Sequence, residues 1–253
     1  MKIGIVQFAP VWEDLESSAK KIDVILDGIE DDIQVLIFPE MSLTGFTMNS
    51  QKFAEEIDGF STTYFMRKSR ELNKHIFAGI IERDDDKIYN SLVHFDNSGL
   101  IISRYRKIHP FSMAGEDVNY TAGSEIIVSK IGETKIGLTI CYDLRFPELY
   151  RLYGKQNCDV IINIANWPVQ RIQHWKVLLQ AHSITNQCFV IGVNRIGTDT
   201  GNKYSGQSRI YNPMGKEILY AEDKEGVFSF DLNLKEVNET QNKFPFLKDI
   251  KLN

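Results

Sequence analysis

Hydrophobic and polar positions along this chain follow two kinds of repeat. Apolar runs of roughly four to eight residues are typical of buried strands, whereas apolar residues spaced three and four apart mark one face of a helix. The run Ile3–Phe8 predicts a strand at the N-terminus. Leu15, Ile22, Ile25 and Ile29 then lie close to one helical face, which predicts a helix over Leu15–Ile29.

The same alternation continues along most of the chain. We expect further helices over Ser61–Asn73, Leu144–Gly154 and Arg171–Asn186. We expect further strands over Val35–Phe38, Ile76–Glu82, Tyr89–Phe95, Gly99–Tyr105, Lys135–Ile140, Val160–Ile164, Val190–Asn194, Ser208–Tyr211, Glu217–Tyr220 and Gly226–Asp231. Strands that alternate with helices predict an α/β fold in which helices cover the sheets. The segment Arg106–Ser124 has no regular pattern, and irregular segments of this length are often functional.

The bulk properties narrow the class of protein. With 253 residues and no repeat or Pro/Gly/Ser-rich linker, the chain is expected to form one domain over residues 1–253. The net charge of −5 and the absence of a long basic run argue against nucleic acid or an anionic membrane as a main partner. No apolar stretch approaches the ~20 residues of a membrane helix, and the first residues enter a strand without a signal-peptide pattern. We therefore expect a cytoplasmic protein.

The three cysteines Cys141, Cys158 and Cys188 are odd in number and lack the spacing of metal ligands, so we expect no disulfide framework, no metal and no cofactor. Cys158 and Cys188 have apolar, strand-like neighbours, which predicts that both are core residues. Cys141 differs, because it stands between the apolar run Lys135–Ile140 and the predicted helix Leu144–Gly154. Unpaired backbone N–H groups and a helix dipole at that position favour a thiolate, so Cys141 is either a nucleophile or a packed core residue.

Three further positions carry charge next to predicted strands. Glu40 follows a buried strand, Lys107 opens the irregular segment, and Glu116 lies within it. Each residue alone is equally consistent with a solvated surface charge. Taken in order with Cys141 they form a catalytic set for amide hydrolysis, which needs a thiol, a base for its proton, a donor to the oxyanion and an acid for the leaving nitrogen.

These residues and their neighbours resemble the nitrilase superfamily of carbon–nitrogen hydrolases. Pro39-Glu40 matches the family's glutamate segment, Tyr105-Arg106-Lys107-Ile108-His109 its lysine segment, and Gly137 to Glu148 its cysteine segment. The resemblance implies an α-β-β-α sandwich of two mixed sheets flanked by helices. It also implies that Cys141 is the acylated nucleophile, Glu40 the general base, Lys107 an oxyanion donor and Glu116 a supporting carboxylate. From these neighbours we expect Lys107 to keep Cys141 ionised and Glu116 to raise the pKa of Glu40.

The segment Asn163-Ile164-Ala165-Asn166-Trp167-Pro168 is similar to the omega-amidase branch, as are Glu40 to Met48 and Val193 to Gly197. This branch removes ammonia from the terminal amide of 2-oxo dicarboxylate monoamides such as 2-oxoglutaramate and 2-oxosuccinamate. The resemblance therefore implies a small amide and water as reaction partners and a homodimer. One departure is that His182 and Thr185 replace an arginine and a glutamate that are usual in the branch.

Phe46, Tyr142, Trp167 and Arg145 are the expected substrate-binding residues, because small-molecule sites are mostly apolar with a few polar anchors. Arg145, Arg195 and Arg209 are candidates for an anionic group of the substrate, although Arg145 is favoured as an ion-pair partner of Asp143 or Glu148. The alternatives within this superfamily are an N-carbamoyl-amide hydrolase and a nitrilase. Outside catalysis, the alternatives are an inactive binding module on this fold and a redox-sensing thiol protein.

Overall fold

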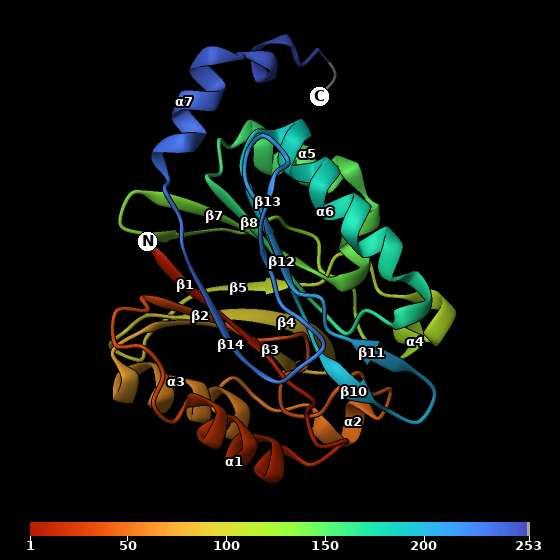
Figure 1. Ribbon diagram of the computed structural model, residues 1–253. Helices are drawn as coiled ribbons and strands as arrows, with labels where there is room; N and C mark the ends of the chain where they lie inside the picture. The colour runs from red at the N-terminus through yellow and green to blue at the C-terminus, as the bar shows by residue number, and fades with distance from the viewer. Residues whose placement is uncertain (252–253) are drawn as a thin grey trace.

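Two six-stranded mixed sheets pack face to face, and helices cover both outer faces (Figure 1). The computed structural model describes residues 1–251. The arrangement is the α-β-β-α sandwich that the sequence resemblance implied. Within residues 1–251, no helix is long and apolar enough to cross a membrane.

The first sheet has the strand order β14-β1-β2-β3-β4-β5. Its three central strands β1, β2 and β3 run parallel, and β4, β5 and β14 are antiparallel to their neighbours. The bounds are β1 (Lys2–Gln7), β2 (Val35–Ile37), β3 (His75–Asp84), β4 (Lys87–Phe95), β5 (Ile101–Arg106) and β14 (Gly226–Asp231). The helices α1 (Leu15–Leu26) and α3 (Phe60–Leu72) pack on its outer face.

The second sheet has the order β13-β12-β9-β8-β7-β6. Its strands β7, β8 and β9 are parallel, so the chain again crosses over through helices. The bounds are β6 (Val128–Ile131), β7 (Thr134–Ile140), β8 (Val160–Ala165), β9 (Phe189–Asn194), β12 (Arg209–Tyr211) and β13 (Glu217–Tyr220). The helices α5 (Pro147–Lys155) and α6 (Ile172–Asn186) cover its outer face.

The core between the sheets is built by alternate residues of the central strands. Ile136, Leu138 and Ile140 of β7 point inward and meet Ile5 and Ile37 of the first sheet. Every one of these side chains is at most 1% exposed. Because full burial of such a side chain contributes about 1.5–3 kcal/mol, this layer fixes the two sheets against each other. The loops that follow the parallel strands are thereby brought together at one end of the sandwich.

Several element boundaries differ from the sequence prediction. The first helix ends at Leu26 rather than Ile29, because Asp27 is extended and Gly28 adopts a φ of +72°. The helix after Cys141 begins at Pro147, since residues Cys141–Arg145 form a 3₁₀ turn first. The strand expected from Gly99 begins at Ile101, because Gly99 lies in the turn with a φ of +88°.

Several short elements and the helix α7 were not predicted. They are β6, β10 (Ile196–Thr198), β11 (Lys203–Ser205), α2 (Ser50–Phe53), α4 (Glu116–Asn119), α7 (Lys235–Lys243) and the 3₁₀ turns Ser112–Ala114, Val169–Arg171 and Phe246–Asp249. The helix α7 extends from the end of the sandwich at the top of Figure 1. Elements of three or four residues carry too few apolar positions to show a period, and their geometry is set by neighbouring segments.

Candidate active site

Polar and reactive side chains follow three parallel strands at the point where each strand ends. Glu40 lies three residues after β2, Cys141 directly after β7, and Asn166 directly after β8. Lys107 directly follows β5, so both sheets supply residues to one place. The carboxyl ends of parallel strands are a common position for ligand sites in α/β folds.

The loop that carries Glu40 is held tightly against β3. Met41 has a φ of +46°, a conformation that costs a non-glycine residue about 1 kcal/mol or more. Gly79 makes this loop possible, because a Cβ at that position would lie 2.5 Å from the backbone nitrogen of Met41 and 2.7 Å from Cα of Glu40. The Ser42 hydroxyl also donates to the Pro39 carbonyl at 2.7 Å and accepts from the Gly79 N–H. The backbone of Glu40 is therefore held in place against β3.

Lys107 lies between two carboxylates. Its ammonium donates to Oε1 of Glu40 at 2.8 Å and to both oxygens of Glu116, at 3.0 and 2.8 Å. Asn90 of β4 donates to the same Oε1 atoms of Glu40 and Glu116, at 2.7 and 2.8 Å. All four side chains are buried. A buried charge needs such partners, so the network holds Lys107 at one position.

Asn166 holds the second oxygen of Glu40. Its backbone N–H donates to Oε2 at 2.9 Å, and its side-chain amide donates to the backbone carbonyl of Glu40 at 2.8 Å. The backbone carbonyl of Asn166 accepts from Sγ of Cys141 at 4.0 Å. One residue after β8 thus connects the glutamate of one sheet to the cysteine of the other.

The three buried ions shift one another's pKa. Burial alone raises the pKa of Glu40, but the charge of Lys107 and the hydrogen bonds from Lys107, Asn90 and Asn166 outweigh it, and the pKa falls below its usual range. Burial raises the pKa of Glu116, and the charge of Glu40 adds to the rise while Lys107 opposes it. The expectation that Glu116 raises the pKa of Glu40 was wrong, because Lys107 and the amides stabilise the Glu40 carboxylate more strongly.

Cys141 occupies a strained turn that a buried aspartate supports. Its φ is +45°, in the left-handed region that most side chains avoid. Asp143 accepts from the backbone N–H of Ile140 at 2.9 Å and from the Tyr105 hydroxyl at 2.7 Å. Its other oxygen accepts from the backbone N–H of His109 at 3.0 Å and pairs with the His109 ring at 2.8 Å. The turn is therefore tied to the segment on either side of Lys107.

The surroundings of Cys141 favour the thiol over the expected thiolate. Burial raises its pKa well above the usual value, the charges of Glu40 and Glu116 raise it further, and Lys107 lowers it. The prediction that Lys107 and a helix terminus keep the sulfur ionised was wrong, because burial and the two carboxylates outweigh the one ammonium. The thiol must lose its proton during the reaction.

A cavity of about 260 Å³ opens at Cys141 and is lined by the four residues predicted to bind substrate. Phe46, Tyr142, Arg145 and Trp167 all contribute to its wall, together with Asn166. The ammonium of Lys107 lies 5.5 Å from the centre of the Phe46 ring, which lines the cavity. Substrate binding by these residues stays a prediction, which their position supports.

The arginines lie differently from the sequence prediction. Arg145 pairs with neither Asp143 nor Glu148, and its guanidinium contacts Nδ1 of His174 at 3.2 Å. Arg195 is buried and donates to the carbonyls of Ile196 and Thr198, while Arg209 pairs with Glu217. Arg195 and Arg209 do not line the cavity. Arg171, which was not proposed as a site residue, does line it.

Two other site residues were missed, and one of them had a visible signal. Asn166 follows the six buried residues of β8, five of which are apolar, as Glu40 follows β2. Asn90 lies inside β4, where a polar residue in a central strand demands buried partners. The partners of its side chain are Glu40 and Glu116, which only the folded chain brings together.

His182, the departure from the usual branch sequence, has a structural role. Its ring stacks on Tyr150 with the ring centres 3.7 Å apart, and its Nε2–H donates to the carbonyl of Leu144 at 3.0 Å. Leu144 lies within the turn that begins at Cys141. His182 therefore supports that turn from α6, while Thr185 is exposed.

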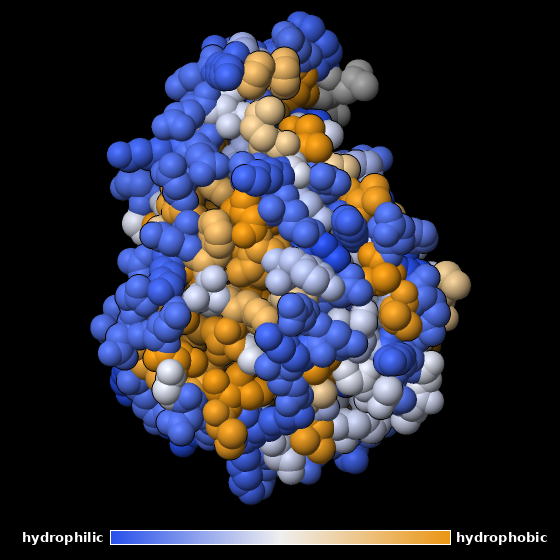
Figure 2. All heavy atoms as spheres, in the orientation of Figure 1, coloured by the Kyte–Doolittle hydropathy of each residue, from blue (hydrophilic) through white to orange (hydrophobic). Residues whose placement is uncertain are grey.

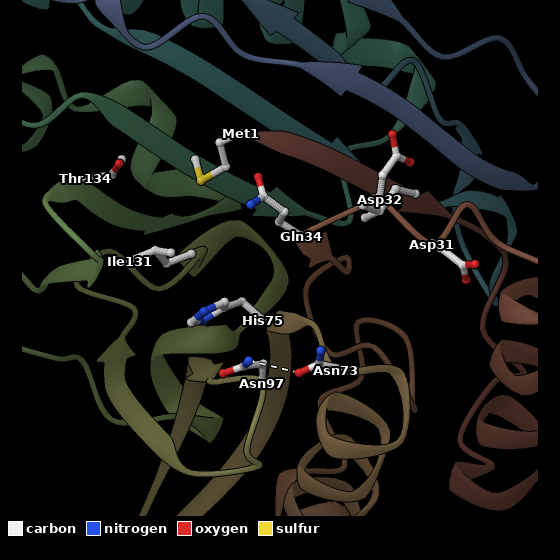
Figure 3. A pocket seen from close by; sticks show the side chains of 10 residues that line it. Met1, Asp31, Asp32, Gln34, Asn73, His75, Asn97, Ile131 and Thr134 are labelled. Carbon is white, nitrogen blue, oxygen red and sulfur yellow. Dashed lines mark hydrogen bonds between the residues drawn. The ribbon is translucent and has the colours of Figure 1, made fainter.

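A second, wider cavity of about 730 Å³ lies away from these residues (Figure 3). It is lined by Met1, Gln34, His75 and others near the amino ends of β1, β2 and β3, opposite the end that carries Glu40. Cys141, Glu40 and Lys107 do not line it. The smaller cavity is therefore the candidate active site, since Cys141 lines it.

The described residues contain neither a cluster of metal ligands nor a disulfide. Residues 1–251 contain no cluster of three or more His, Cys, Asp and Glu side chains that is arranged to hold a metal ion. None of the three cysteines forms a disulfide, and Cys158 and Cys188 are buried core residues as predicted.

Comparison with known proteins gives consistent matches. The carbon–nitrogen hydrolase family model matches residues 2–242. A 2-oxoglutaramate amidase of Bacillus subtilis is 32% identical, and the match covers 98% of this chain and 97% of that protein. The omega-amidase YafV of Escherichia coli K12 is 31% identical, covering 98% of this chain and 96% of that protein. XC1258 from Xanthomonas campestris, a CN-hydrolase superfamily protein with an arsenic adduct in its active site, superimposes with a TM-score of 0.95 at 27% identity, covering 100% of this chain and 98% of that one.

Proposed function

This chain belongs to the carbon–nitrogen hydrolase family of the nitrilase superfamily and is a hydrolase of carbon–nitrogen bonds, and we propose that it is an omega-amidase. Its substrate would be the terminal amide of a 2-oxo dicarboxylate monoamide such as 2-oxoglutaramate or 2-oxosuccinamate. Relatives that match nearly the whole chain are named for this activity. The observation that carries the proposal is the Glu40–Lys107–Glu116 network beside Cys141.

The first step of the proposed reaction forms a tetrahedral adduct. Sγ of Cys141 attacks the amide carbon while Glu40 accepts the thiol proton, which agrees with a raised thiol pKa and a carboxylate held ionised. The carbonyl oxygen becomes an oxyanion. Lys107 and the backbone N–H of Tyr142, at the start of a 3₁₀ turn, are the proposed donors to it.

The second step releases ammonia. Glu40 returns its proton to the nitrogen, the carbon–nitrogen bond breaks, and a thioester on Cys141 remains. Water then attacks the thioester with Glu40 as the base, which gives the carboxylic acid and restores the thiol. The sum is one amide and one water converted to one acid and one ammonia. Glu116 holds Lys107 in place throughout.

The size of the cavity supports a small substrate. Its volume of about 260 Å³ lies below the ~300–1,000 Å³ of sites that hold drug-sized ligands. The walls combine aromatic rings with few polar groups, as expected for a molecule with an apolar middle and polar ends.

We also propose a cytoplasmic homodimer. The outer face of the second sheet is the favoured interface, since Leu152 of α5 and Val177 and Ile184 of α6 are exposed. Figure 2 shows hydrophobic spheres among hydrophilic ones over these two helices. Light scattering on the purified protein, compared with a Val177→Glu and Ile184→Glu double variant, tests this proposal. A monomeric parent protein would refute it.

Mass spectrometry after brief incubation with candidate amides tests the proposed reaction. We expect an acyl adduct on Cys141 with 2-oxosuccinamate, and ammonia release that is lost in Cys141→Ala and Glu40→Gln while the fold is kept. Parallel assays use a nitrile and an N-carbamoyl amino acid. Ammonia release from the carbamoyl compound alone would replace the omega-amidase proposal with an N-carbamoyl-amide hydrolase, and nitrile turnover alone would indicate a nitrilase.

A further inference from the structure

Arg145 and Arg171 are the only charged side chains among the described residues that line the candidate active-site cavity. Neither guanidinium has a carboxylate within 4 Å among residues 1–251. Four of the other eight arginines do pair with a carboxylate, as Arg104 and Arg106 do with Glu82. Two arginines without an acidic partner in a pocket wall leave their N–H donors available to a ligand.

Aromatic rings hold both guanidinium groups in place. The guanidinium carbon of Arg145 lies 4.9 Å from the centre of the Trp167 ring and 6.0 Å from that of Tyr142. That of Arg171 lies 5.2 Å from the centre of the Phe111 ring. Stacking occupies the faces of a guanidinium and leaves its edges, which carry the donors, for polar partners. Nη1 and Nη2 of Arg145 share Nδ1 of His174 at 3.3 and 3.2 Å, a neutral partner that a carboxylate can replace.

These rings are in turn fixed to the reactive groups. The backbone N–H of Phe111 donates to Glu116 at 2.6 Å, and Trp167 directly follows Asn166, whose N–H groups hold Glu40. The indole N–H of Trp167 donates to the backbone carbonyl of Arg171 at 2.7 Å. Both guanidinium groups are therefore held at a set position relative to Glu40 and Glu116.

The positive electrostatic potential at the amino end of α6 adds to the charges of Arg145 and Arg171. Arg171 immediately precedes the first turn of α6, a helix of 15 residues whose amino end carries partial positive charge. No Asp or Glu lines the cavity among the described residues. An anionic group is therefore favoured at this wall, and a cationic one is excluded.

We propose that Arg145 and Arg171 bind the carboxylate at the far end of the substrate and so select amides that carry a negative charge. This inference rests on the proposed function, since it gives the specificity residues of that same site. The amide lies at Cys141, and the carboxylate contacts the arginine pair across the apolar middle of the cavity. Amides with an uncharged end lose these contacts and gain nothing in return.

Paired kinetics on matched substrates test the proposal. The parent enzyme, Arg171→Gln, Arg171→Lys and Arg145→Gln are assayed with 2-oxosuccinamate and with butanamide, whose far end is a methyl group. We expect kcat/KM for the anionic amide to fall on the order of ten- to hundredfold in each Gln variant, while that for butanamide changes less than about threefold. Arg171→Lys should retain part of the activity on 2-oxosuccinamate, because the positive charge is kept while the paired N–H donors of the guanidinium are lost.

Lys176→Gln is the matched control, because Lys176 is an exposed cation on α6 and does not line the cavity. Equal losses on both substrates, or no loss on the anionic one, would overturn the proposal. Should the Gln variants fail to fold, inhibition of the parent enzyme tests the proposal instead. Succinate should inhibit butanamide hydrolysis, and this inhibition should weaken as the salt concentration rises. If neutral succinamide inhibits as strongly as succinate does, the proposal is refuted.

Failure of the proposed function gives a different result. If the parent enzyme hydrolyses only N-carbamoyl compounds, the omega-amidase proposal is refuted. The arginine pair is then tested by comparing kcat/KM for the anionic N-carbamoyl-β-alanine with that for the neutral N-carbamoylpropylamine. If 2-oxosuccinamate is a good substrate and the Gln variants act on it as the parent does, the arginine proposal falls alone.

Discussion

The hydroxyl of Tyr105 donates a 2.7 Å hydrogen bond to the buried carboxylate of Asp143, and this contact joins the two segments that supply Lys107 and Cys141. Tyr105 lies two residues before Lys107, and Asp143 lies two residues after Cys141. His109 binds the other oxygen of the same carboxylate. Asp143 therefore sets the position of the Lys107 ammonium relative to Sγ of Cys141, although it contacts neither of these two reactive groups.

Replacing Asp143 should damage both the fold and the activity. Asp143→Asn keeps the shape but points an amide N–H₂ at groups that already donate, so we expect a loss of about 1–3 kcal/mol in unfolding free energy. We also expect kcat to fall by roughly a hundredfold through displacement of Cys141. Urea unfolding and amide turnover measure these effects.

Tyr105→Phe is the graded comparison, because it removes one hydrogen bond to Asp143 and leaves the others. It should cost about 1 kcal/mol. Equal stability and activity for Asp143→Asn and the parent protein would contradict the positioning role of Asp143.

The sequence predicted this segment well because its signals are local. Cys141 directly follows the apolar run that ends at Ile140, and the matching motif extends through residues 105–109 and 137–148. The α/β class was also readable, since β7 and β8 have continuous buried stretches. What the sequence did not reveal depends on contacts between distant segments. Asn90 meets Glu40 and Glu116 only in the fold, and the protonation of Cys141 follows from the summed charges around it.

Gly79 should be intolerant of a side chain, because the loop bearing Glu40 passes directly over it. In Gly79→Ala the new Cβ would lie 2.5–2.8 Å from backbone atoms of residues 39–41, and backbone cannot give way as a side chain can. We expect a loss of about 1–3 kcal/mol in stability and roughly a hundredfold loss in kcat as Glu40 moves.

Thermal unfolding and steady-state kinetics test this prediction. Gly201→Ala is the control for stability, since a Cβ there meets open space at an ordinary φ. A Gly79→Ala enzyme with unchanged kcat would show that the Glu40 loop adapts without cost.

Alkylation of Cys141 should be slow at neutral pH. Its raised pKa means that the reactive thiolate is scarce there, so the rate of iodoacetamide modification should increase about tenfold per pH unit and show no plateau below pH 9. In Glu40→Gln the carboxylate charge that helps raise this pKa is gone, so alkylation at pH 8 should be faster than in the parent protein.

Peptide mass spectrometry locates the adduct, and Cys141→Ala measures the background from Cys158 and Cys188. Burial raises the pKa of Cys158 to about 12 and that of Cys188 well above its usual value, so both should react little. A rate for Cys141 that levels off near pH 7 would contradict the thiol resting state.

His94 should make the protein unstable in acid. Its ring is buried between the sheets, in contact with His75 at 2.9 Å and Ser129 at 2.7 Å, and burial followed by the charge of His75 lowers its pKa from 6.5 to about 3. The folded state therefore resists protonation while the unfolded chain accepts a proton below pH 6.5. The stability is complete above pH 6.5 and should decrease by about 1.4 kcal/mol per pH unit as the pH falls from 6.5 towards 3.

Urea unfolding between pH 7.5 and 4.5 measures this slope. In His94→Gln, which keeps hydrogen-bonding groups but does not titrate, the slope should be smaller by about one proton, and the remaining slope should include His182, whose pKa burial lowers to about 4. The control variant is His174→Gln, which replaces an exposed histidine on α6. Identical slopes for the parent protein and His94→Gln would mean that the His75–His94 pair accepts a proton without opening the sheets.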